Sequence, residues 1–539
     1  MQKLQRVGRY YRRYGFMATA ARATQALSPF SRYREQRWYK AHCPTTDELE
    51  KQRAETFAQP LLFSILVPVY NTKASYLLEM AQSFLAQSYP QWEACLYDGA
   101  STRAETKAAL KQIAELDPRF HVQFGTNNDG ISGNSNHALA MAQGDYTALC
   151  DHDDLYAPDA LYCFRKAIDA TQAELLYSDE DKINDKGTRH FAPHFKPDFA
   201  PDSLRSGNYI CHLLVLKRSL MQSIGGWKRG FDGSQDHELT LRASEQAAGI
   251  AHIPRVLYHW RMISSSASHQ ALERCVQAAQ RAVQEQTERL ALPCEVGLEE
   301  GLLHVQYQTP QEPCVAAIVY GERPADCIAS LRRCDPQIRW EILTVEQTDF
   351  ASLDRAARQA KSPYLLFIDS QIRAANENFA RELLMFAQRD DVGAATPMIE
   401  DMHQRVLHMG YVLGELPRSR GMGHYRCFAN YMQAAYIAVN VSGGSRRAMM
   451  IRKDHYLQAG GFDLAYAQAW ADVALCRQFR WNVFTPYAEA QTVIPLRQAE
   501  LLFGGNEADN AVYRQKNTKP VQDAFYNPNF TRETADFRW

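Results

Sequence analysis

Short apolar runs alternate with amphipathic segments along the first half of the chain. Strand-sized apolar runs lie at 63–67, 92–97, 120–123 and 146–150. Apolar residues at helical spacing lie between them, at 76–87, 103–116 and 131–142. Because strands that alternate with helices pair in parallel, this pattern predicts an α/β fold with a mostly parallel sheet between helices.

Polar residues follow three of these predicted strands at the point where each strand ends. They are Pro68-Val69-Tyr70-Asn71, Asp98-Gly99 and the acidic cluster Asp151-His152-Asp153-Asp154. Ligands of parallel α/β sheets bind beyond the carboxyl ends of the strands. We therefore expect these segments, although distant in sequence, to converge on one edge of the sheet.

The acidic cluster has the D-x-D spacing with which two carboxylates can share a divalent cation. Hard oxygen ligands suit Mg²⁺ or Mn²⁺, which complete their shells with water and substrate phosphates. The chain has neither a P-loop lysine motif nor a dinucleotide glycine fingerprint, so a metal held by carboxylates would have to balance phosphate charge. Asp153 is the predicted metal ligand, and Asp151 is predicted to contact ribose or metal-bound water. The alternative is a solvated acidic turn.

A second carboxylate of interest is Asp236, in the segment GSQDHEL at 233–239. At the start of a predicted helix it would be oriented by the helix dipole and free N–H groups. It is either a general base that takes a proton from an acceptor hydroxyl or simply the N-cap of the helix. No serine elbow or Cys/His pattern offers a covalent nucleophile.

The chain contains an internal repeat. YTALCDHDDLYAPDAL at 146–161 is echoed by YLLFIDSQIRAANENF at 364–379, and a second pair of similar segments follows at 213–242 and 448–477. Two copies of one fold explain the length of 539 residues. The predicted divisions are a basic segment and linker at 1–60, a first domain at 61–305, a second at 306–500 and a tail at 501–539.

The second copy has lost part of the chemistry of the first. Gln371 stands at the position of the metal aspartate, Asp369 is retained, and Asp472 matches the base. Because a neutral amide is a poor ligand for a hard dication, we expect no metal-dependent transfer here. The copy would hold an acceptor glycan or support the first domain, and a metal-independent activity through Asp472 is the alternative.

Composition narrows the function classes. Hydrophobic residues make up 46% and charged residues 22%, and the net charge of −1 excludes a nucleic-acid-binding character for the chain as a whole. The twelve cysteines are scattered and are expected to be reduced thiols in a cytoplasm. No apolar run approaches the roughly 20 residues of a membrane span, and no signal peptide is evident.

Residues 1–40 differ from the rest in charge. They carry ten Lys or Arg and one acidic residue, Glu35, a net +9, with aromatic residues interleaved. Such a segment suits an anionic lipid surface, at about 1 kcal/mol per basic residue. We therefore expect a cytoplasmic protein that is peripheral on the inner face of the cytoplasmic membrane. The alternative is a helical arm packed on the domain.

The motifs quoted so far, and several others, resemble glycosyltransferase family 2. The matching pieces cover nearly all of residues 63–265 in order: SILVPVYNT (64–72), LAQSYPQWEACLYDGAST (85–102), GISGNSNHALAMAQGDYTALCDHDDLYAP (130–158), LLYSDEDK (175–182), NYICHLLVLKRSL (208–220), GGWKRGFDGSQDHELTLR (225–242) and HIPRVLYHWR (252–261). The resemblance implies a Rossmann-like GT-A fold, in tandem with a degenerate copy. It is to the bacterial branch that builds surface polysaccharides such as O-antigen, rhamnosyltransferases included.

The resemblance also implies roles for individual residues. Pro68, Tyr70 and Asp98 would line the nucleotide, with Asp151 at the ribose, Asp153 at the metal, Asp236 as base, and His259 at the metal or diphosphate. The family often has a second acidic residue where this chain has Gly99, which leaves recognition of the base open.

The implied reaction moves a hexose or deoxyhexose, with inversion, from a dTDP-, UDP- or GDP-linked donor to a glycan or lipid-linked glycan. One base without a covalent nucleophile favours a single displacement. A non-catalytic glycan-binding scaffold and a bifunctional transferase are the alternatives. A nucleotidyltransferase would need a glycine- and lysine-rich loop near 64–75, and a processive synthase usually has membrane spans.

Overall fold

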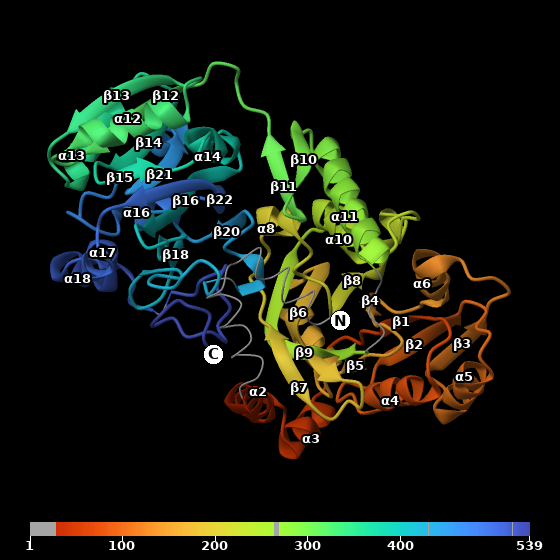
Figure 1. The fold of residues 1–539 in the computed structure, drawn as a ribbon. Coiled ribbons are helices and arrows are strands. Elements are labelled where there is room, and N and C mark those ends of the chain that lie inside the picture. Colours follow the sequence, from red (N-terminus) through yellow and green to blue (C-terminus); the bar gives the residue numbers. More distant parts are fainter. Residues whose placement is uncertain (1–28, 264–268, 430, 520) are drawn as a thin grey trace. The chain divides into compact units, whose positions relative to one another are not determined.

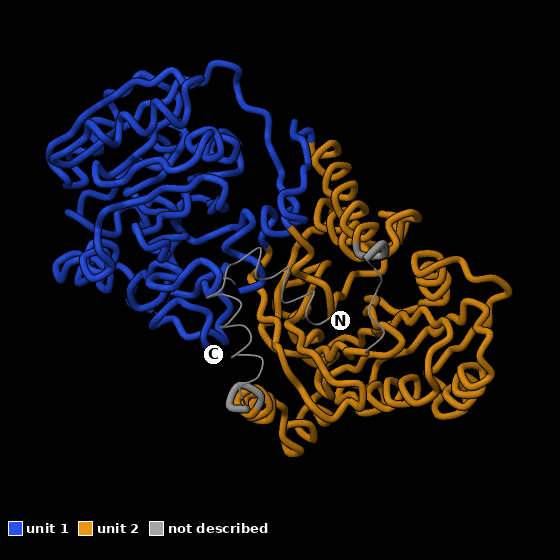
Figure 2. The backbone as a smooth tube through the Cα atoms, in the orientation of Figure 1, with its two compact units in different colours: residues 1–18, 200–206, 291–539 blue, residues 19–199, 207–290 orange. Residues whose placement is uncertain are grey.

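The computed structural model describes residues 29–263, 269–429, 431–519 and 521–539, whose helices and strands are labelled in Figure 1. The chain forms two compact units, which are coloured separately in Figure 2. In the described part of the chain, unit 2 comprises residues 29–199 and 207–290, and unit 1 comprises residues 200–206 and 291–539, apart from the gaps given above. The chain therefore enters unit 1 briefly at helix α8 (Pro201–Ser206) and returns before the main body of unit 1 begins.

Unit 2 is built on a nine-stranded sheet with the order β3-β2-β1-β4-β8-β6-β9-β5, in which β7 pairs with β6. Its strands are β1 (Phe63–Val69), β2 (Trp92–Asp98), β3 (Phe120–Phe124), β4 (Tyr146–Leu149), β5 (Leu155–Tyr156), β6 (Leu175–Asn184), β7 (His190–His194), β8 (Leu214–Lys217) and β9 (Ile250–Met262). The α/β class is confirmed.

The sheet is mixed rather than mostly parallel. Four pairings are parallel (β1 with β2, β1 with β4, β2 with β3, β6 with β9) and four are antiparallel (β4 with β8, β6 with β8, β6 with β7, β5 with β9). The parallel part is the part whose strands are joined through helices. Antiparallel strands need no such crossover, and here β6 turns directly into β7.

The helices of unit 2 differ in how much apolar surface they bury. They are α2 (Pro29–His42), α3 (Thr46–Ala54), α4 (Ala74–Leu85), α5 (Ala104–Leu116), α6 (Gly130–Met141), α7 (Ala160–Thr171), α9 (Arg218–Ser223), α10 (Gln235–Gln246) and α11 (His269–Arg289). In α4, for example, Leu77, Met80 and Phe84 are buried and join the core under β1 and β2. The three helices predicted from periodicity are confirmed to within two residues at each end.

Unit 1 repeats the strand order of unit 2. Its sheet runs β13-β12-β14-β21-β16-β22-β15, which corresponds one for one to β2-β1-β4-β8-β6-β9-β5. The pairing directions also agree, since β12 is parallel to β13 and β14, β21 is antiparallel to β14 and β16, and β22 is parallel to β16. This shared topology accords with the sequence repeat.

The elements of unit 1 are as follows. Its strands are β10 (Cys294–Glu299), β11 (Leu302–Tyr307), β12 (Cys314–Tyr320), β13 (Arg339–Val345), β14 (Tyr364–Asp369), β15 (Ile372–Ala374), β16 (Val392–Asp401), β17 (Val406–His408), β18 (Tyr411–Val412), β19 (Arg418–Ser419), β20 (Val439–Val441), β21 (Ala448–Arg452) and β22 (Trp481–Thr492). Its helices, besides α8, are α12 (Pro324–Cys334), α13 (Phe350–Gln359), α14 (Phe379–Ala387), η1 (Tyr431–Gln433), α15 (Lys453–Gln458), α16 (Ala471–Cys476), α17 (Leu496–Gly504) and α18 (Glu507–Lys516).

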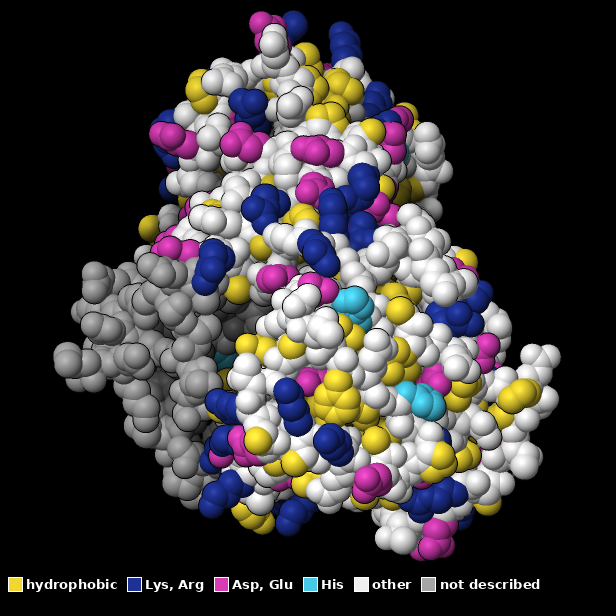
Figure 3. Space-filling view, turned by 90° about the vertical axis from the view of Figure 1, so that its right-hand side faces the viewer, with side chains coloured by type: hydrophobic (Ala, Val, Ile, Leu, Met, Phe, Trp, Pro, Cys, Tyr) yellow, Lys and Arg dark blue, Asp and Glu magenta, His cyan; other side chains and the backbone are white. Residues whose placement is uncertain are grey.

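Residues 1–28 of the predicted basic segment lie outside the described residues, so its structure can be followed only from residue 29. Helix α2 packs on unit 2, where Trp38 meets Phe195 edge to face at 4.9 Å between ring centroids and Tyr39 stacks on His190 at 3.4 Å. Among the described residues, no helix is both long and apolar enough to cross a bilayer. On the face drawn in Figure 3, basic and acidic side chains are interspersed, in keeping with the net charge of −1.

Candidate active site in unit 2

The predicted convergence at one edge of the sheet follows from strand pairing. Strand β1 lies between β2 and β4 in parallel register, with Val69 opposite Asp98, so the segments after all three strands leave the sheet on the same side. Asp98 is buried and accepts a hydrogen bond from the backbone N–H of Ser101 at 3.1 Å. Pro68 is half-buried, whereas Tyr70 is 42% exposed and presents its ring at this edge.

The structure explains why the residue after Asp98 is glycine. A Cβ atom at Gly99 would lie 2.3 Å from Nδ2 of Asn134, a buried residue of α6. The amide of Asn134 in turn donates to Oδ1 of Asn128 at 3.0 Å. A second acidic side chain at this strand end would require the amide of Asn134 to move, and in this chain Asn134 supplies the polar group that lies here. Its importance was not visible in the sequence, because α6 is 35 residues further along.

The four residues of the acidic cluster divide into two kinds. Asp154 is fully buried and accepts hydrogen bonds from the Tyr258 hydroxyl at 2.6 Å and from the Arg261 N–H at 2.7 Å. It therefore fastens the cluster to β9. The side chains of Asp151 and Asp153 remain 38% and 20% exposed. These two carboxylates are available to a ligand.

The surroundings of Asp153 favour a cation. Removal from water raises the pKa of its carboxyl, the neighbouring His152 opposes that rise, and the negative charge of Asp151 adds to it. A divalent ion bound beside the two carboxylates would offset both the lost hydration and the repulsion between their charges. The arrangement therefore fits a metal with oxygen ligands.

His212 approaches the same cluster from the segment before β8. Its Nε2 lies 3.7 Å from Oδ2 of Asp151, and its ring stacks on Tyr258 with centroids 4.6 Å apart. The ligand atoms of Asp151, Asp154 and His212 all lie within 4.8 Å of one another. In the sequence, His212 lies in the segment NYICHLLVLKRSL that resembles the family, but no spacing marks it as a site residue.

A buried ion pair holds the backbone of His212. Lys196, which is fully buried, donates from Nζ to the carbonyl oxygens of Ile210 and His212 and lies 3.2 Å from Oε2 of Glu180. The same Glu180 oxygen accepts the His212 N–H at 2.9 Å. The lysine lowers the pKa of Glu180 against the effect of burial, so the pair stays charged and fixes the loop.

Asp236 lies in the first turn of α10 but is not its cap. The N-cap residue is Ser234, so the alternative of a simple capping role is wrong. The carboxylate accepts one hydrogen bond at each oxygen, from Nε1 of Trp227 at 3.2 Å and from Nε2 of Gln235 at 3.1 Å. Removal from water raises its pKa, His212 lowers it, and Asp151 raises it. A half-buried carboxylate held only by neutral donors is suited to accept a proton.

The structure groups His259 with other residues than Asp153. Neighbouring residues of a strand point to opposite faces, and while Tyr258 faces Asp154, Nδ1 of His259 lies 2.7 Å from Oδ1 of Asp181. The other oxygen of Asp181 lies 2.8 Å from Nδ1 of His190. The ligand atoms of Asp181, His190 and His259 lie within 4.8 Å of one another, and the role of His259 at the metal or diphosphate stays a prediction.

In unit 1, the corresponding carboxylates are held by two neighbouring arginines, Asp369 by the side chain of Arg447 and Asp472 by the backbone N–H of Arg446. Asp369 forms an ion pair with Arg447, whose guanidinium also donates to the Leu502 carbonyl of α17 at 3.1 Å. Asp472 accepts the N–H of Arg446 at 2.9 Å. Gln371 is exposed, and its backbone N–H donates to Asp369 at 3.0 Å. The guanidinium of Arg447 thus lies beside Asp369, the one aspartate retained at the position of the acidic cluster.

Comparison with known proteins places this site in a family context. Residues 64–223 match the model of glycosyl transferase family 2. An uncharacterized protein of Sinorhizobium fredii is 31% identical over 88% of this chain and 58% of its own length. The O-antigen biosynthesis protein RfbC of Myxococcus xanthus is 29% identical over 93% of this chain and 42% of its own length. The chain thus spans about half the length of these curated relatives.

Among solved structures, residues 1–349 of TarS from S. aureus in complex with UDP are 19% identical, with a TM-score of 0.34 over 43% of this chain and 70% of that one. A TM-score of this size does not establish a shared fold. The family match, by contrast, covers β1 through α9, including the acidic cluster and His212. The chain therefore carries a glycosyltransferase family 2 domain at residues 64–223.

Proposed function

We propose that unit 2 transfers a sugar with inversion from a nucleoside-diphosphate donor to a glycan acceptor, in the assembly of a bacterial surface polysaccharide. The observation that carries the proposal is the pairing of two available carboxylates, Asp151 and Asp153, with a third, Asp236, whose surroundings suit a general base. The family match and the O-antigen relative support it.

Asp236 takes the proton from the acceptor hydroxyl, whose oxygen then attacks the anomeric carbon of the donor. The hydrogen bonds from Trp227 and Gln235 keep this carboxylate in place and ionised. Pro68, Tyr70 and Asp98 receive the nucleotide, with Asp151 at the ribose. His212, held by Lys196 and Glu180, lies 3.7 Å from Asp151 and lowers the pKa of Asp236.

A divalent ion, Mg²⁺ or Mn²⁺, would be held by Asp153 with help from Asp151, and His259 is the more distant candidate. When bound, it supplies Lewis-acid stabilisation of the departing diphosphate. The carboxylate oxygens of Asp153 are partly exposed and its pKa is raised, and both properties fit such an ion.

The acceptor is proposed to be lipid-linked, with the protein at an anionic membrane surface through residues 1–40. The net +9 of this segment supports the proposal. The stacking of Tyr39 on His190 shows that α2 also packs on unit 2, so the two readings of this segment are compatible.

A panel of dTDP-, UDP- and GDP-sugars with Mn²⁺ or Mg²⁺ tests the function. We expect one nucleotide class to be cleaved faster than the others when a glycan acceptor is present, and EDTA to stop release of the nucleoside diphosphate. Release is measured by coupled assay, and the anomeric configuration of the product by NMR. A product with retained configuration would contradict the inverting mechanism, and no release with any donor would favour a glycan-binding scaffold.

We further propose that unit 1 does not transfer sugar. Asp369 is paired with the side chain of Arg447, Asp472 accepts the backbone N–H of Arg446, and Gln371 stands where the metal aspartate would be. The full chain is expected to bind one equivalent of nucleoside diphosphate with Mn²⁺ by calorimetry, and Asp472→Asn is expected to keep transfer within about twofold of wild type. Two equivalents bound, or loss of transfer on this substitution, would instead support the bifunctional alternative.

A further inference from the structure

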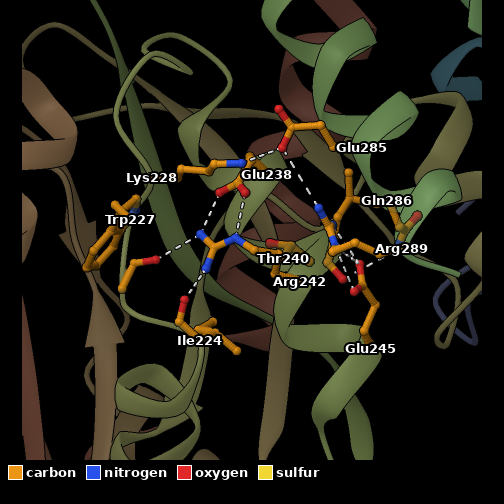
Figure 4. Close-up of polar contacts among 12 residues, drawn as sticks. Ile224, Trp227, Lys228, Glu238, Thr240, Arg242, Glu245, Glu285, Gln286 and Arg289 are labelled. Carbon is orange, nitrogen blue, oxygen red and sulfur yellow. Dashed lines mark hydrogen bonds and ion pairs between the residues drawn. The ribbon is translucent and has the colours of Figure 1, made fainter.

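We propose that the ion pair between Glu238 and Arg242 positions the base Asp236 through Trp227. The inference rests on the proposed function, since it assigns these residues to the base of that reaction. None of the three is argued to touch a substrate, so all are positioning residues. Figure 4 shows the contacts from which the argument is built.

Arg242 ties helix α10 to the turn before it. Its Nε and Nη2 each lie 2.5 Å from one carboxylate oxygen of Glu238, one helical turn earlier. Its remaining N–H groups donate to the carbonyl oxygens of Ile224 at 2.6 Å and Gly226 at 2.8 Å. Glu238 is buried, so the guanidinium is fixed by a charge that water does not screen. The turn at 224–226 is therefore held at a set distance from α10.

The turn presents Trp227 in one orientation. Gly225 and Gly226 have φ angles of +77° and +66°, and a Cβ at Gly226 would lie 2.4 Å from Oδ1 of Asn136. This requirement for glycine lets Asn136 reach the backbone, where it accepts the Trp227 N–H at 2.9 Å and donates to the Trp227 carbonyl at 2.8 Å. Trp227 is thus fixed by Asn136 on one side and by the Arg242-bound turn on the other.

The indole N–H of Trp227 is the element that reaches the base. It donates to Oδ1 of Asp236 at 3.2 Å. The other groups that face this carboxylate are His212, Asp151, Cys211 and the amide of Gln235. A donor to the ionised carboxylate stabilises the form that can accept a proton. Its loss would raise the pKa of Asp236 and would also free the carboxylate to rotate.

A second Arg–Glu pair nearby provides a matched control. Arg289 of α11 lies 2.7 Å from Glu245 of α10, in the same helix pair and the same view in Figure 4. Its contacts with Glu245 join the two helices, and its second ion pair, to Glu285 at 3.9 Å, lies within α11. Arg289 itself contacts neither the 224–226 turn nor Trp227, although Glu285 also pairs with Lys228. Replacing Arg289 removes an ion pair from α10 without altering the proposed positioning.

The experiment compares pH profiles of kcat/KM for Trp227→Phe, Arg242→Met, Arg242→Lys and Arg289→Met. For Trp227→Phe we expect the acidic limb to move to higher pH and kcat at neutral pH to fall about tenfold, with the donor KM unchanged. Arg242→Met should move the limb in the same direction with a loss of about 10- to 100-fold, because the base is displaced. Arg242→Lys should recover part of that loss, and Arg289→Met should match wild type.

Wild-type pH profiles for Trp227→Phe would overturn the inference, as would a shift of equal size in Arg289→Met. If Arg242→Met does not fold, as judged by circular dichroism, Trp227→Phe decides the question alone, since it keeps the ring and removes only the N–H. A different result would contradict the proposed function itself. Full activity of a chain without the Asp236 carboxylate would refute the base, whereas an inactive Asp236 variant beside an unshifted Trp227→Phe refutes only the positioning role.

Discussion

Asp236→Asn is expected to lower kcat for sugar transfer by about 10³-fold, within the 10²- to 10⁴-fold range of general-base catalysis. Asparagine has the same shape and can still accept from Trp227, so the fold and the donor Kd should not change. Transfer is measured with radiolabelled donor at saturating acceptor, and donor binding by calorimetry. The carboxylate is lost while the pocket remains, so the effect should appear in kcat.

The matched control is Asp232→Asn. Asp232 lies four residues away in the same loop, is exposed, and accepts a hydrogen bond from Ser132 at 2.8 Å. We expect its substitution to leave kcat within about twofold of wild type. Equal losses in the two variants would point to a general disturbance of the loop, and full activity of Asp236→Asn would show that another group removes the proton.

Asp153→Ala is expected to abolish binding of Mn²⁺, followed by electron paramagnetic resonance in the presence of nucleoside diphosphate, and to lower kcat/KM by about 10²- to 10³-fold. Because the pKa of Asp153 is raised, protons should compete with the metal on the acid side of neutrality, so Mn²⁺ affinity of the wild type should fall as pH is lowered.

Asp169→Ala serves as the control for that experiment. Asp169 belongs to α7, is 42% exposed, and pairs with Arg165. It should leave Mn²⁺ binding unchanged. If Asp153→Ala still bound Mn²⁺, the metal would have to be held by other residues. Asp151 and His212, which lie 3.7 Å apart, would then be the candidates.

The order of strands and helices in the first part of unit 2 could be predicted because local periodicity marks it. The predicted strands at 63–67 and 92–97 correspond to β1 and β2, because a short run of apolar residues favours a buried strand whatever its distant partners are. The mixed direction of the sheet could not be predicted in this way. It depends on β8 entering between β4 and β6, which is a long-range pairing that no local pattern encodes.

In the candidate site, too, residue types could be predicted from the sequence, whereas roles that depend on long-range contacts could not. Asp151, Asp153 and Asp154 look alike in sequence, and only contacts with Tyr258 and Arg261, more than 100 residues away, turn Asp154 into a structural residue. His212 could not be identified as a site residue from the sequence for a similar reason. Its position beside Asp151 depends on Lys196 and Glu180, which lie elsewhere in the chain. For His259, the motif gives a residue type but not the face of β9 on which it lies.

The brief passage of the chain through unit 1 at residues 200–206 has a consequence for any attempt to separate the two units. In α8, Asp202 is buried against Arg389 and Asn440, far along the chain. A gene that ends after residue 290 would encode unit 2 with an internal segment that lacks these partners, and only Arg205 of α8 itself would remain to pair with Asp202. Dissection of the tandem therefore calls for a short polar replacement of residues 200–206, not a single boundary, and the two halves are best regarded as parts of one interleaved polypeptide.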